Sequence, residues 1–288
     1  MIRAFGGVPS AAVPLGGGQG TSWRAGGIVL KPDGRPLELA WRAQFVQQLR
    51  LDDHIRVSRQ LRCSHGDLSC DGWASTEWLE GHHRTDKWSE MLAVSEDFHA
   101  AAGRSTAGWP RFMEQRSDPW SRATRVAWGE EALPPMPPSA AKLVREMHDL
   151  LTTAPDVAVR QVVHSDLAGN VLFADDLGLP PAVIDISPQF RPVDYAEAVL
   201  VADAVAWNGA PLSFAEAFLE ESAERIGDLA RAVIFRVATA ALVPGASPAR
   251  VLGEADAYRS ILPALMPPER RCGVPIRRHS PGRPMQKG

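Results

Sequence analysis

Short apolar runs separated by glycine dominate the chain from Val13 to Leu79. Runs of this kind predict strands, and they span Trp23 to Lys31, Ile55 to Cys63 and Trp73 to Leu79. Between the first two runs, apolar residues recur at a spacing of four. This spacing predicts an amphipathic helix whose buried stripe is Leu37, Trp41, Phe45 and Leu49. The part of the chain before Gly81 is therefore expected to form a small β-sheet with one helix.

After Gly81 the pattern changes to longer, helical periodicities. The predicted helices cover residues 87–102, 139–152, 194–207, 213–226, 228–242 and 248–262. Residues 106–138 hold several tryptophans and prolines, which favours a long loop or short helices, and a substrate loop is one interpretation. Residues 267–288 are rich in proline and basic side chains, which predicts a disordered tail.

These patterns predict an α+β protein with two lobes: a small antiparallel β lobe at residues 1–80 and a larger, mainly helical lobe at residues 81–266. The net charge of −3 shows no global basic surface, so we expect no nucleic-acid partner. The most apolar helices are interrupted by Glu197 and Asp203 or by Arg236, so we expect no membrane span. Three cysteines are too few for a disulfide framework and favour a reducing cytoplasm.

The clearest chemical signal is a pair of short apolar strands, Val171 to Phe173 and Ala182 to Ile184, on either side of a turn. The turn is rich in Asp, Gly and Pro, so the strands are expected to pair as a hairpin. Asn170 and Asp185 would then meet at its open end, where an amide oxygen and a carboxylate can share one hard cation. Mg²⁺ prefers such oxygen ligands and is often completed by substrate phosphates, so the pair predicts a magnesium site with a nucleotide.

Asp166 lies four residues before Asn170, on the loop that enters the hairpin. From there it can accept or orient the proton of a substrate hydroxyl opposite a metal-bound phosphate, which is the position of a catalytic base. His164 follows two apolar residues of a predicted buried strand, which favours a bracing role in the loop over a chemical one.

A glycine-rich turn, residues 15–22, lies between β segments of the first lobe. Its missing side chains, at Gly17, Gly18 and Gly20 before Thr21, would let backbone amides approach phosphates. Lys31 closes the strand that follows and is the only lysine before Lys87. A compact ammonium suits phosphate oxygens, so Lys31 is a second predicted phosphate contact.

The motif His164-Ser165-Asp166 followed by Asn170, an apolar strand and Ile184-Asp185 resembles the aminoglycoside phosphotransferase and choline kinase-like family. Protein kinases carry one more residue between the catalytic Asp and the Asn, so the spacing resembles the small-molecule branch. The resemblance covers roughly residues 5 to 265, and residues such as Ala4-Phe5-Gly6 are most similar to an actinobacterial branch. It implies a bilobal protein-kinase-like fold, ATP and Mg²⁺ as cofactors, and a small-molecule hydroxyl substrate such as an aminoglycoside or amino sugar.

In this family the strand lysine pairs with a helix glutamate, for which Glu38 is the candidate, although a first-turn acid also favours the helix dipole. Backbone groups around Glu77 and Leu79 correspond to the interlobe hinge that binds adenine. The implied reaction is in-line transfer of the γ-phosphoryl group of ATP to a hydroxyl, with Asp166 positioning the acceptor. The competing hypothesis is a catalytically weak nucleotide-binding regulator or scaffold with the same fold.

Overall fold

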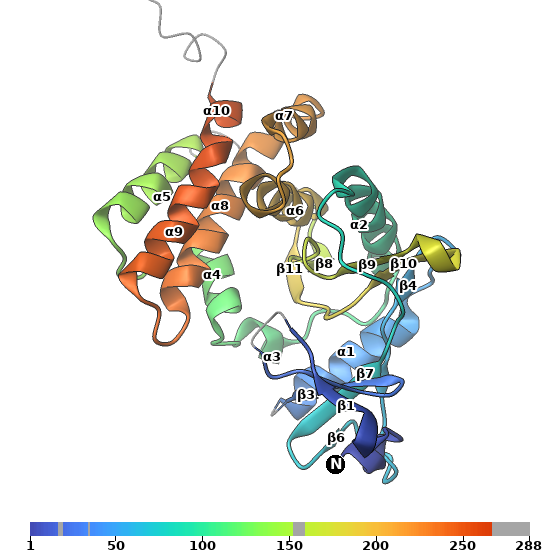
Figure 1. Ribbon diagram of the computed structural model, residues 1–288. Helices are drawn as coiled ribbons and strands as arrows, with labels where there is room; N and C mark the ends of the chain where they lie inside the picture. The colour runs from blue at the N-terminus through green and yellow to red at the C-terminus, as the bar shows by residue number, and fades with distance from the viewer. Residues whose placement is uncertain (17–19, 34, 152–158, 267–288) are drawn as a thin grey trace, which may run out of the picture.

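The computed structural model describes residues 1–16, 20–33, 35–151 and 159–266, and its chain is arranged as a small β lobe below a larger helical lobe (Figure 1). Gly17, Gly18 and the predicted tail at residues 267–288 lie outside the described residues.

The first lobe is built on an antiparallel sheet with strand order β1-β2-β3-β7-β5, and β6 pairs with β7. Its apolar interior includes Ala25, Ile28 and Leu30. The elements are η1 (Ile2–Phe5), η2 (Pro9–Ala11), β1 (Ala12–Pro14), β2 (Trp23–Ala25), β3 (Ile28–Pro32), α1 (Pro36–Gln48), β4 (Arg56–Val57), β5 (Gln60–Leu61), β6 (Ser69–Cys70) and β7 (Trp73–Glu77).

This lobe differs from the sequence-based prediction in several places. The run from Ile55 to Cys63 is two short strands, β4 and β5, which belong to different sheets. The run from Trp23 to Lys31 is two strands, because Gly26 has a positive φ of 73° and turns the chain between β2 and β3. Trp41 and Phe45 are buried on α1 as predicted, but Leu37 is 65% exposed. Leu37 stands in the first turn of α1, where Glu38 and Leu39 are the buried residues instead.

The second lobe consists of a helical layer and two small sheets. Helix α8 packs on α4, α5, α6 and α9 around an apolar core that includes Leu143, Tyr195 and Phe235. The elements are α2 (Trp88–Gly103), α3 (Arg111–Glu114), α4 (Pro119–Ala127), α5 (Pro138–Leu150), β8 (Gln161–His164), β9 (Val171–Ala174), η3 (Asp175–Leu177), β10 (Leu179–Val183), β11 (Pro188–Arg191), α6 (Val193–Trp207), α7 (Leu212–Glu220), α8 (Arg225–Leu242), α9 (Pro248–Tyr258), η4 (Arg259–Ile261) and α10 (Leu262–Leu265).

The predicted hairpin is confirmed. Strands β9 and β10 pair antiparallel, with Val171 opposite Val183 and Leu172 opposite Ala182. A second antiparallel pair, β8 and β11, carries His164 opposite Pro188. The loop between β8 and β9 and the segment between β10 and β11 therefore connect the same two strand pairs, and these two connections carry Asp166 and Asp185.

The two lobes share a core as well as a chain connection. Trp41 and Phe45 of α1 belong to the same buried cluster as Phe98 of α2 and Leu167 of the loop after β8. Strand β4, although it precedes residue 80, pairs in parallel with β10 of the second lobe. The boundary at residue 80 stays a prediction, but long-range pairing already crosses it.

Across the described ranges, every helix is too short or too polar to span a membrane.

Candidate active site

The end of the β9–β10 hairpin holds the three residues that the sequence analysis assigned to the catalytic loop and the metal. The backbone N–H of Ile184 donates to the carbonyl of Asn170 at 2.9 Å, so Asp185 follows directly beside Asn170. The Asn170 side-chain amide donates to the backbone carbonyl of Asp166 at 2.6 Å and more weakly to its carboxylate at 3.3 Å. Because the nitrogen of the amide makes these bonds, its oxygen points the other way and is free to act as a ligand.

Asp185 adopts a left-handed backbone conformation with a φ of 47°, which is uncommon for a residue with a side chain. Such conformations are costly and are found at functional sites when the surrounding structure holds them in place. The carboxylate of Asp185 is about half exposed and meets Lys31 Nζ at 2.7 Å.

Lys31 reaches Asp185 because side chains alternate along β3. Leu30 points into the lobe's core and is fully buried, so Lys31 points the opposite way, toward the second lobe. The contact joins the strand lysine of one lobe to the predicted metal ligand of the other.

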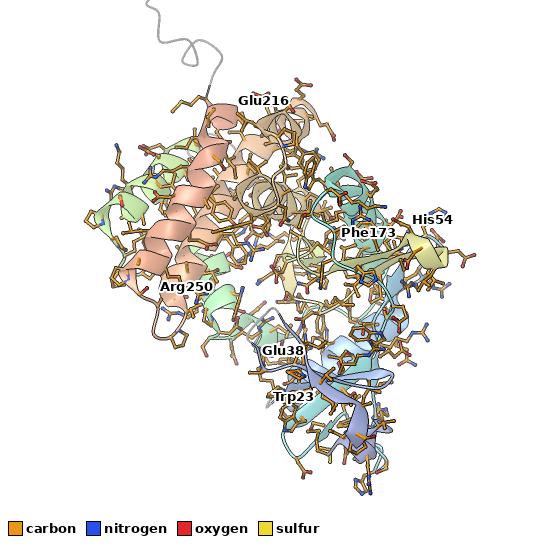
Figure 2. All side chains as sticks on the ribbon, in the orientation of Figure 1. Trp23, Glu38, His54, Phe173, Glu216 and Arg250 are labelled. Carbon is orange, nitrogen blue, oxygen red and sulfur yellow. The ribbon has the colours of Figure 1, made fainter. Side chains whose placement is uncertain are left out.

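The expected pairing of Lys31 with Glu38 is not formed. Glu38 is 4% exposed, and its carboxylate lies 2.8 Å from Arg35 and 3.8 Å from Arg116 of the α3–α4 segment. Figure 2 places Glu38 at the junction of α1 with that segment. The two arginines compensate the buried negative charge of Glu38. Lys31 pairs with Asp185 instead, so the predicted Lys31–Glu38 pair is corrected.

His164 braces the loop. Its backbone N–H donates to Nε2 of the buried His99 at 3.0 Å, and its Nδ1 accepts the backbone N–H of Asp166 at 3.2 Å. A ring nitrogen that accepts must be unprotonated, so His164 carries its proton on Nε2, facing the carbonyl of Ile184. Burial lowers the pKa of His164. Burial also lowers the pKa of His99, and the neighbouring His164 ring lowers it further, to about 3. Both rings are therefore neutral at neutral pH.

Asp166 is held by an arginine that the sequence analysis did not assign to the site. Nη2 of Arg236, from α8, donates to Asp166 Oδ1 at 2.7 Å. Burial alone would raise the pKa of Asp166, but the charge and hydrogen bond of Arg236 outweigh it and leave the pKa below its usual value. Asp166 is therefore ionised at neutral pH.

Arg236 is itself fixed by Asp203 of α6. Its Nε donates to Asp203 Oδ1 at 2.9 Å, its Nη2 contacts Asp203 Oδ2, and the hydroxyl of Tyr258 donates to Asp203 Oδ1 at 2.5 Å. In sequence, Arg236 appears only as a charge interrupting an apolar helix, and that interruption was the available signal. Its partners lie 33 and 70 residues away, beyond the reach of any local pattern.

A pocket of about 250 Å³ opens beside the loop that carries Asp166. Its lining joins the loop to α6, α8 and α9, and consists of Ala168, Gly169, Asp203, Trp207, Asn208, Arg236, Glu254 and Tyr258. Trp207 is 56% exposed, and burial raises the pKa of Glu254 above its usual value despite the charge of Arg236. The acidic side chains of this site, Asp166, Asp203 and Glu254, outnumber the one arginine of the lining, Arg236.

The glycine-rich turn closes between β1 and β2, where the backbone N–H of Leu15 donates to the carbonyl of Ser22 at 2.9 Å. Gly20 has a φ of 68°, a conformation that favours glycine, and Thr21 is exposed. Gly17 and Gly18 fall outside the described residues, so their predicted phosphate contacts stay predictions.

The predicted hinge follows β7. The backbone N–H of Glu77 donates to the carbonyl of Arg59, and the carbonyl of Glu77 accepts a hydrogen bond from Ser58 Oγ, so both groups already have partners in the protein. In the described part of the chain, the backbone groups of Leu79 make no hydrogen bond to protein. Further along, His82 bonds Phe173 of β9 through both backbone groups, which connects the segment after β7 to the β9–β10 hairpin.

The donor set at the hairpin end fits Mg²⁺. One carboxylate and one amide oxygen are hard ligands, and Mg²⁺ is usually held by one or two carboxylates together with substrate phosphates and water. Within the ranges that the structure describes, no cluster of three or more His, Cys, Asp or Glu side chains is arranged around a metal position. The chain thus offers the few ligands expected of a site that a nucleotide completes.

No protein-family model matches the chain, and no curated protein sequence matches it either. Solved structures do. The apo form of a thermostable mutant of aminoglycoside phosphotransferase APH(4)-Ia superposes with a TM-score of 0.58 at 17% identity, covering 95% of this chain and 98% of that chain. A ternary complex of such a mutant with AMP-PNP and hygromycin B gives 0.55 at 18%, covering 90% and 96%. A choline/ethanolamine kinase family protein from Mesorhizobium loti gives 0.54 at 15%, covering 93% and 94%.

At these identities the likeness establishes the fold. The chain has the bilobal α+β, protein-kinase-like fold of aminoglycoside phosphotransferases and choline kinase-family proteins, as the sequence motifs predicted.

Proposed function

We propose that the protein is an ATP-dependent phosphotransferase that moves the γ-phosphoryl group to a hydroxyl of a small molecule. The observation that carries this proposal is a set of three contacts: the Lys31–Asp185 ion pair, the backbone bond from Ile184 to Asn170 beside it, and the bond from the Asn170 side chain to Asp166. These contacts support the proposal because phosphoryl transfer would need a cation for the phosphates, oxygen ligands for a metal and a base close together, and Lys31, Asn170, Asp185 and Asp166 would supply them.

The nucleotide is assigned to the junction of the lobes. The glycine turn, with Gly17, Gly18, Gly20 and Thr21, would cover the phosphates, and Lys31 would contact their oxygens. The adenine would meet the backbone at Leu79 and the carbonyl of Glu77. Similar structures support this assignment, because one of them holds AMP-PNP.

Asn170 and Asp185 would hold Mg²⁺. When bound there, the ion supplies positive charge that offsets the charge developing on the phosphate oxygens. Lys31, now paired with Asp185, stands close enough to share the same phosphates.

Asp166 would receive the acceptor hydroxyl. The hydroxyl oxygen forms a bond to the γ-phosphorus while the bond from that phosphorus to the β–γ bridging oxygen breaks, and ADP leaves. The hydroxyl proton passes to the Asp166 carboxylate and then to solvent. A carboxylate with a lowered pKa is a weak base, so its main contribution is to orient the hydroxyl until the proton is lost late in the transfer.

The pocket beside Asp166 is the candidate acceptor site. Its surplus of acidic side chains and the exposed face of Trp207 favour a hydroxyl compound that carries positive charge, such as an aminoglycoside or amino sugar. The similar ternary complex contains hygromycin B, which agrees with this class.

The test is ADP release with Mg²⁺ and ATP against a panel of aminoglycosides, amino sugars, amino alcohols and neutral sugars. Acceptor-dependent ADP release, together with a phosphorylated product, supports the proposal and identifies the class. AMP-PNP binding with no turnover on any acceptor would contradict it and favour a nucleotide-binding regulator.

A further inference from the structure

Arg236 approaches the catalytic loop from α8, 70 residues further along the chain than Asp166. Its side chain is 12% exposed, and one nitrogen, Nη2, contacts a carboxylate of each neighbour: Asp166 Oδ1 at 2.7 Å and Asp203 Oδ2. This single guanidinium therefore lies between two acidic groups that would otherwise repel each other.

The edge of the Arg236 guanidinium that carries Nε and Nη2 binds the Asp203 carboxylate. Nε and Nη2 bind its two oxygens side by side, the bidentate geometry that fixes a guanidinium in direction, and Tyr258 also donates to Asp203. Asp166 receives only the remaining hydrogen of Nη2. Its Oδ1 is thus anchored, while Oδ2 meets the amide of Asn170 at 3.3 Å and keeps lone pairs for a further donor.

Lysine could supply charge at this point but could not make the same contacts. An ammonium has no planar fork, so it cannot bind both oxygens of Asp203 and still point one fixed hydrogen at Asp166. The arrangement consequently uses the shape of arginine as well as its charge.

We propose that Arg236 is a positioning residue: anchored by Asp203 and Tyr258, it fixes the Asp166 carboxylate in the orientation that receives the acceptor hydroxyl. The proposal rests on the proposed function of Asp166 and goes beyond it by naming the residue that sets the geometry of the base.

The test compares Arg236→Lys, Arg236→Met and the double variant Asp203→Asn/Arg236→Met, which removes the arginine together with its buried counter-charge. Arg231→Met is the matched control, because Arg231 also lies on α8 but pairs with Asp228 and stacks on Trp128. For each protein, acceptor phosphorylation, ATP hydrolysis by water and the KM for ATP are measured, and thermal unfolding confirms a folded sample.

We expect Arg236→Met and the double variant to lower kcat for acceptor phosphorylation about 100-fold, since small displacements of a reacting group cost this much. The KM for ATP should stay within about twofold, because ATP binds elsewhere. Arg236→Lys should recover part of the loss, and the ratio of hydrolysis to transfer should rise in all three variants. A purely structural role would lower both reactions together. Acceptor phosphorylation by Arg236→Met within threefold of that by Arg231→Met overturns the proposal.

Crystal structures of wild type and Arg236→Lys separate this proposal from the proposed function, because they need no turnover. The proposal expects one Asp166 carboxylate orientation in wild type and a rotated or divided one in the variant. An unchanged orientation overturns it, whereas a changed orientation in a protein that phosphorylates no acceptor supports the positioning and contradicts the kinase assignment.

Discussion

Lys31 links the two lobes through the predicted phosphate site, since its ammonium lies 2.7 Å from Asp185. Replacing it with methionine keeps much of the apolar stem of the side chain and removes the charge. We expect Lys31→Met to lower kcat/KM for ATP about 100-fold by removing a contact to the transferring phosphate. Steady-state kinetics with the preferred acceptor measures this.

Lys87→Met is the control for that experiment. Lys87 forms a comparable ion pair with Asp175, 2.5 Å away, at the far end of the same hairpin. An equal loss of kcat/KM in the two variants would show that charge loss near the hairpin, and not the phosphate contact, causes the effect.

Glu197 of α6 carries a pH-dependent contribution to stability. Burial raises its pKa from 4.5 to about 7, although Arg225 opposes the shift, and Asp194, Glu96 and Glu221 add to it. Because the folded pKa is the higher one, this contribution is complete below about pH 4.5 and is lost as pH rises through about 7. A shift of this size corresponds to about 3 kcal/mol.

We therefore expect Glu197→Gln to gain unfolding free energy relative to wild type as pH rises from 4.5 to 8, by up to about 3 kcal/mol. Chemical denaturation at several pH values measures the difference between the two proteins. Glu220→Gln, which removes an exposed carboxylate at the end of α7, is the matched control. A Glu197→Gln difference that does not change with pH contradicts the assignment.

At the residue scale, the sequence predicted those site residues whose neighbours lie close along the chain. Asp166, Asn170 and Asp185 are close in the chain, so their meeting could be predicted from one hairpin. Glu38 and Arg236 depend on partners from distant segments, such as Arg116 for Glu38, and no pattern in α1 or α8 contains that information. The buried charge of Glu38 is compensated by two cations, one from its own turn and one from the α3–α4 segment.

At the scale of the element, the predicted hinge contains Gly81, which lies between β7 and the second lobe. Its φ is 146°, and a Cβ there would lie 2.9 Å from Leu172 Cβ and 3.0 Å from the Phe173 carbonyl. We expect Gly81→Ala to lower the free energy of unfolding by about 3 kcal/mol, because the backbone would be strained and the added methyl group would clash with β9.

Gly178→Ala separates the two causes. Gly178 has a φ of 63° at the tip of the β9–β10 hairpin, and an added methyl group would meet nothing within 4 Å, so this variant reports strain alone, about 1 kcal/mol. Denaturant titration of both variants compares them, and equal losses would show that contact with β9 is unimportant.

The long apolar helices were predictable because their apolar side chains continue over several turns and are buried in the second lobe. Helix α2 spans Trp88–Gly103 against a predicted 87–102, and α6 spans Val193–Trp207 against 194–207. Helix α7 instead ends at Glu220, before the predicted end at residue 226, where the Ser222 hydroxyl bonds Glu224 and the following turn starts α8 at Arg225. Such local side-chain hydrogen bonding is not visible in periodicity.

The whole molecule is expected to respond to the nucleotide as one body, because α1 and β4 of the first lobe are packed or paired with the second. A ligand that binds only the folded protein stabilises it, by about 2.7 kcal/mol at one hundred times its Kd. We expect AMP-PNP with Mg²⁺ to raise the Tm in a single cooperative transition and EDTA to reverse most of the gain.

Asp185→Asn should weaken the Mg²⁺-dependent part of that rise while leaving the Tm without ligand within a few degrees, since the Asp185 carboxylate is about half exposed. Two separate unfolding transitions, or a rise that is independent of Mg²⁺ in wild type, would contradict the account of a shared site.

At the scale of the whole molecule, the order of motifs predicted the fold more reliably than any single element. The predicted glycine turn, strand lysine, hinge and catalytic loop, taken in that order, indicated a protein-kinase-like fold, and the similar structures share that fold. The crossing of β4 to β10 could not be predicted, because two residues, Arg56 and Val57, give too short a pattern to specify a partner so far along the chain.

The most direct test of the central claim is ³¹P NMR of ATP, Mg²⁺ and the best acceptor of the panel with wild type, Asp166→Ala and Asp176→Ala. Asp176 is an exposed acid on the hairpin tip and serves as the matched control. The account predicts a new phosphomonoester signal with wild type and Asp176→Ala, and a rate at least about 100-fold lower with Asp166→Ala although that variant still binds AMP-PNP. Equal rates of phosphomonoester formation in all three proteins would contradict it.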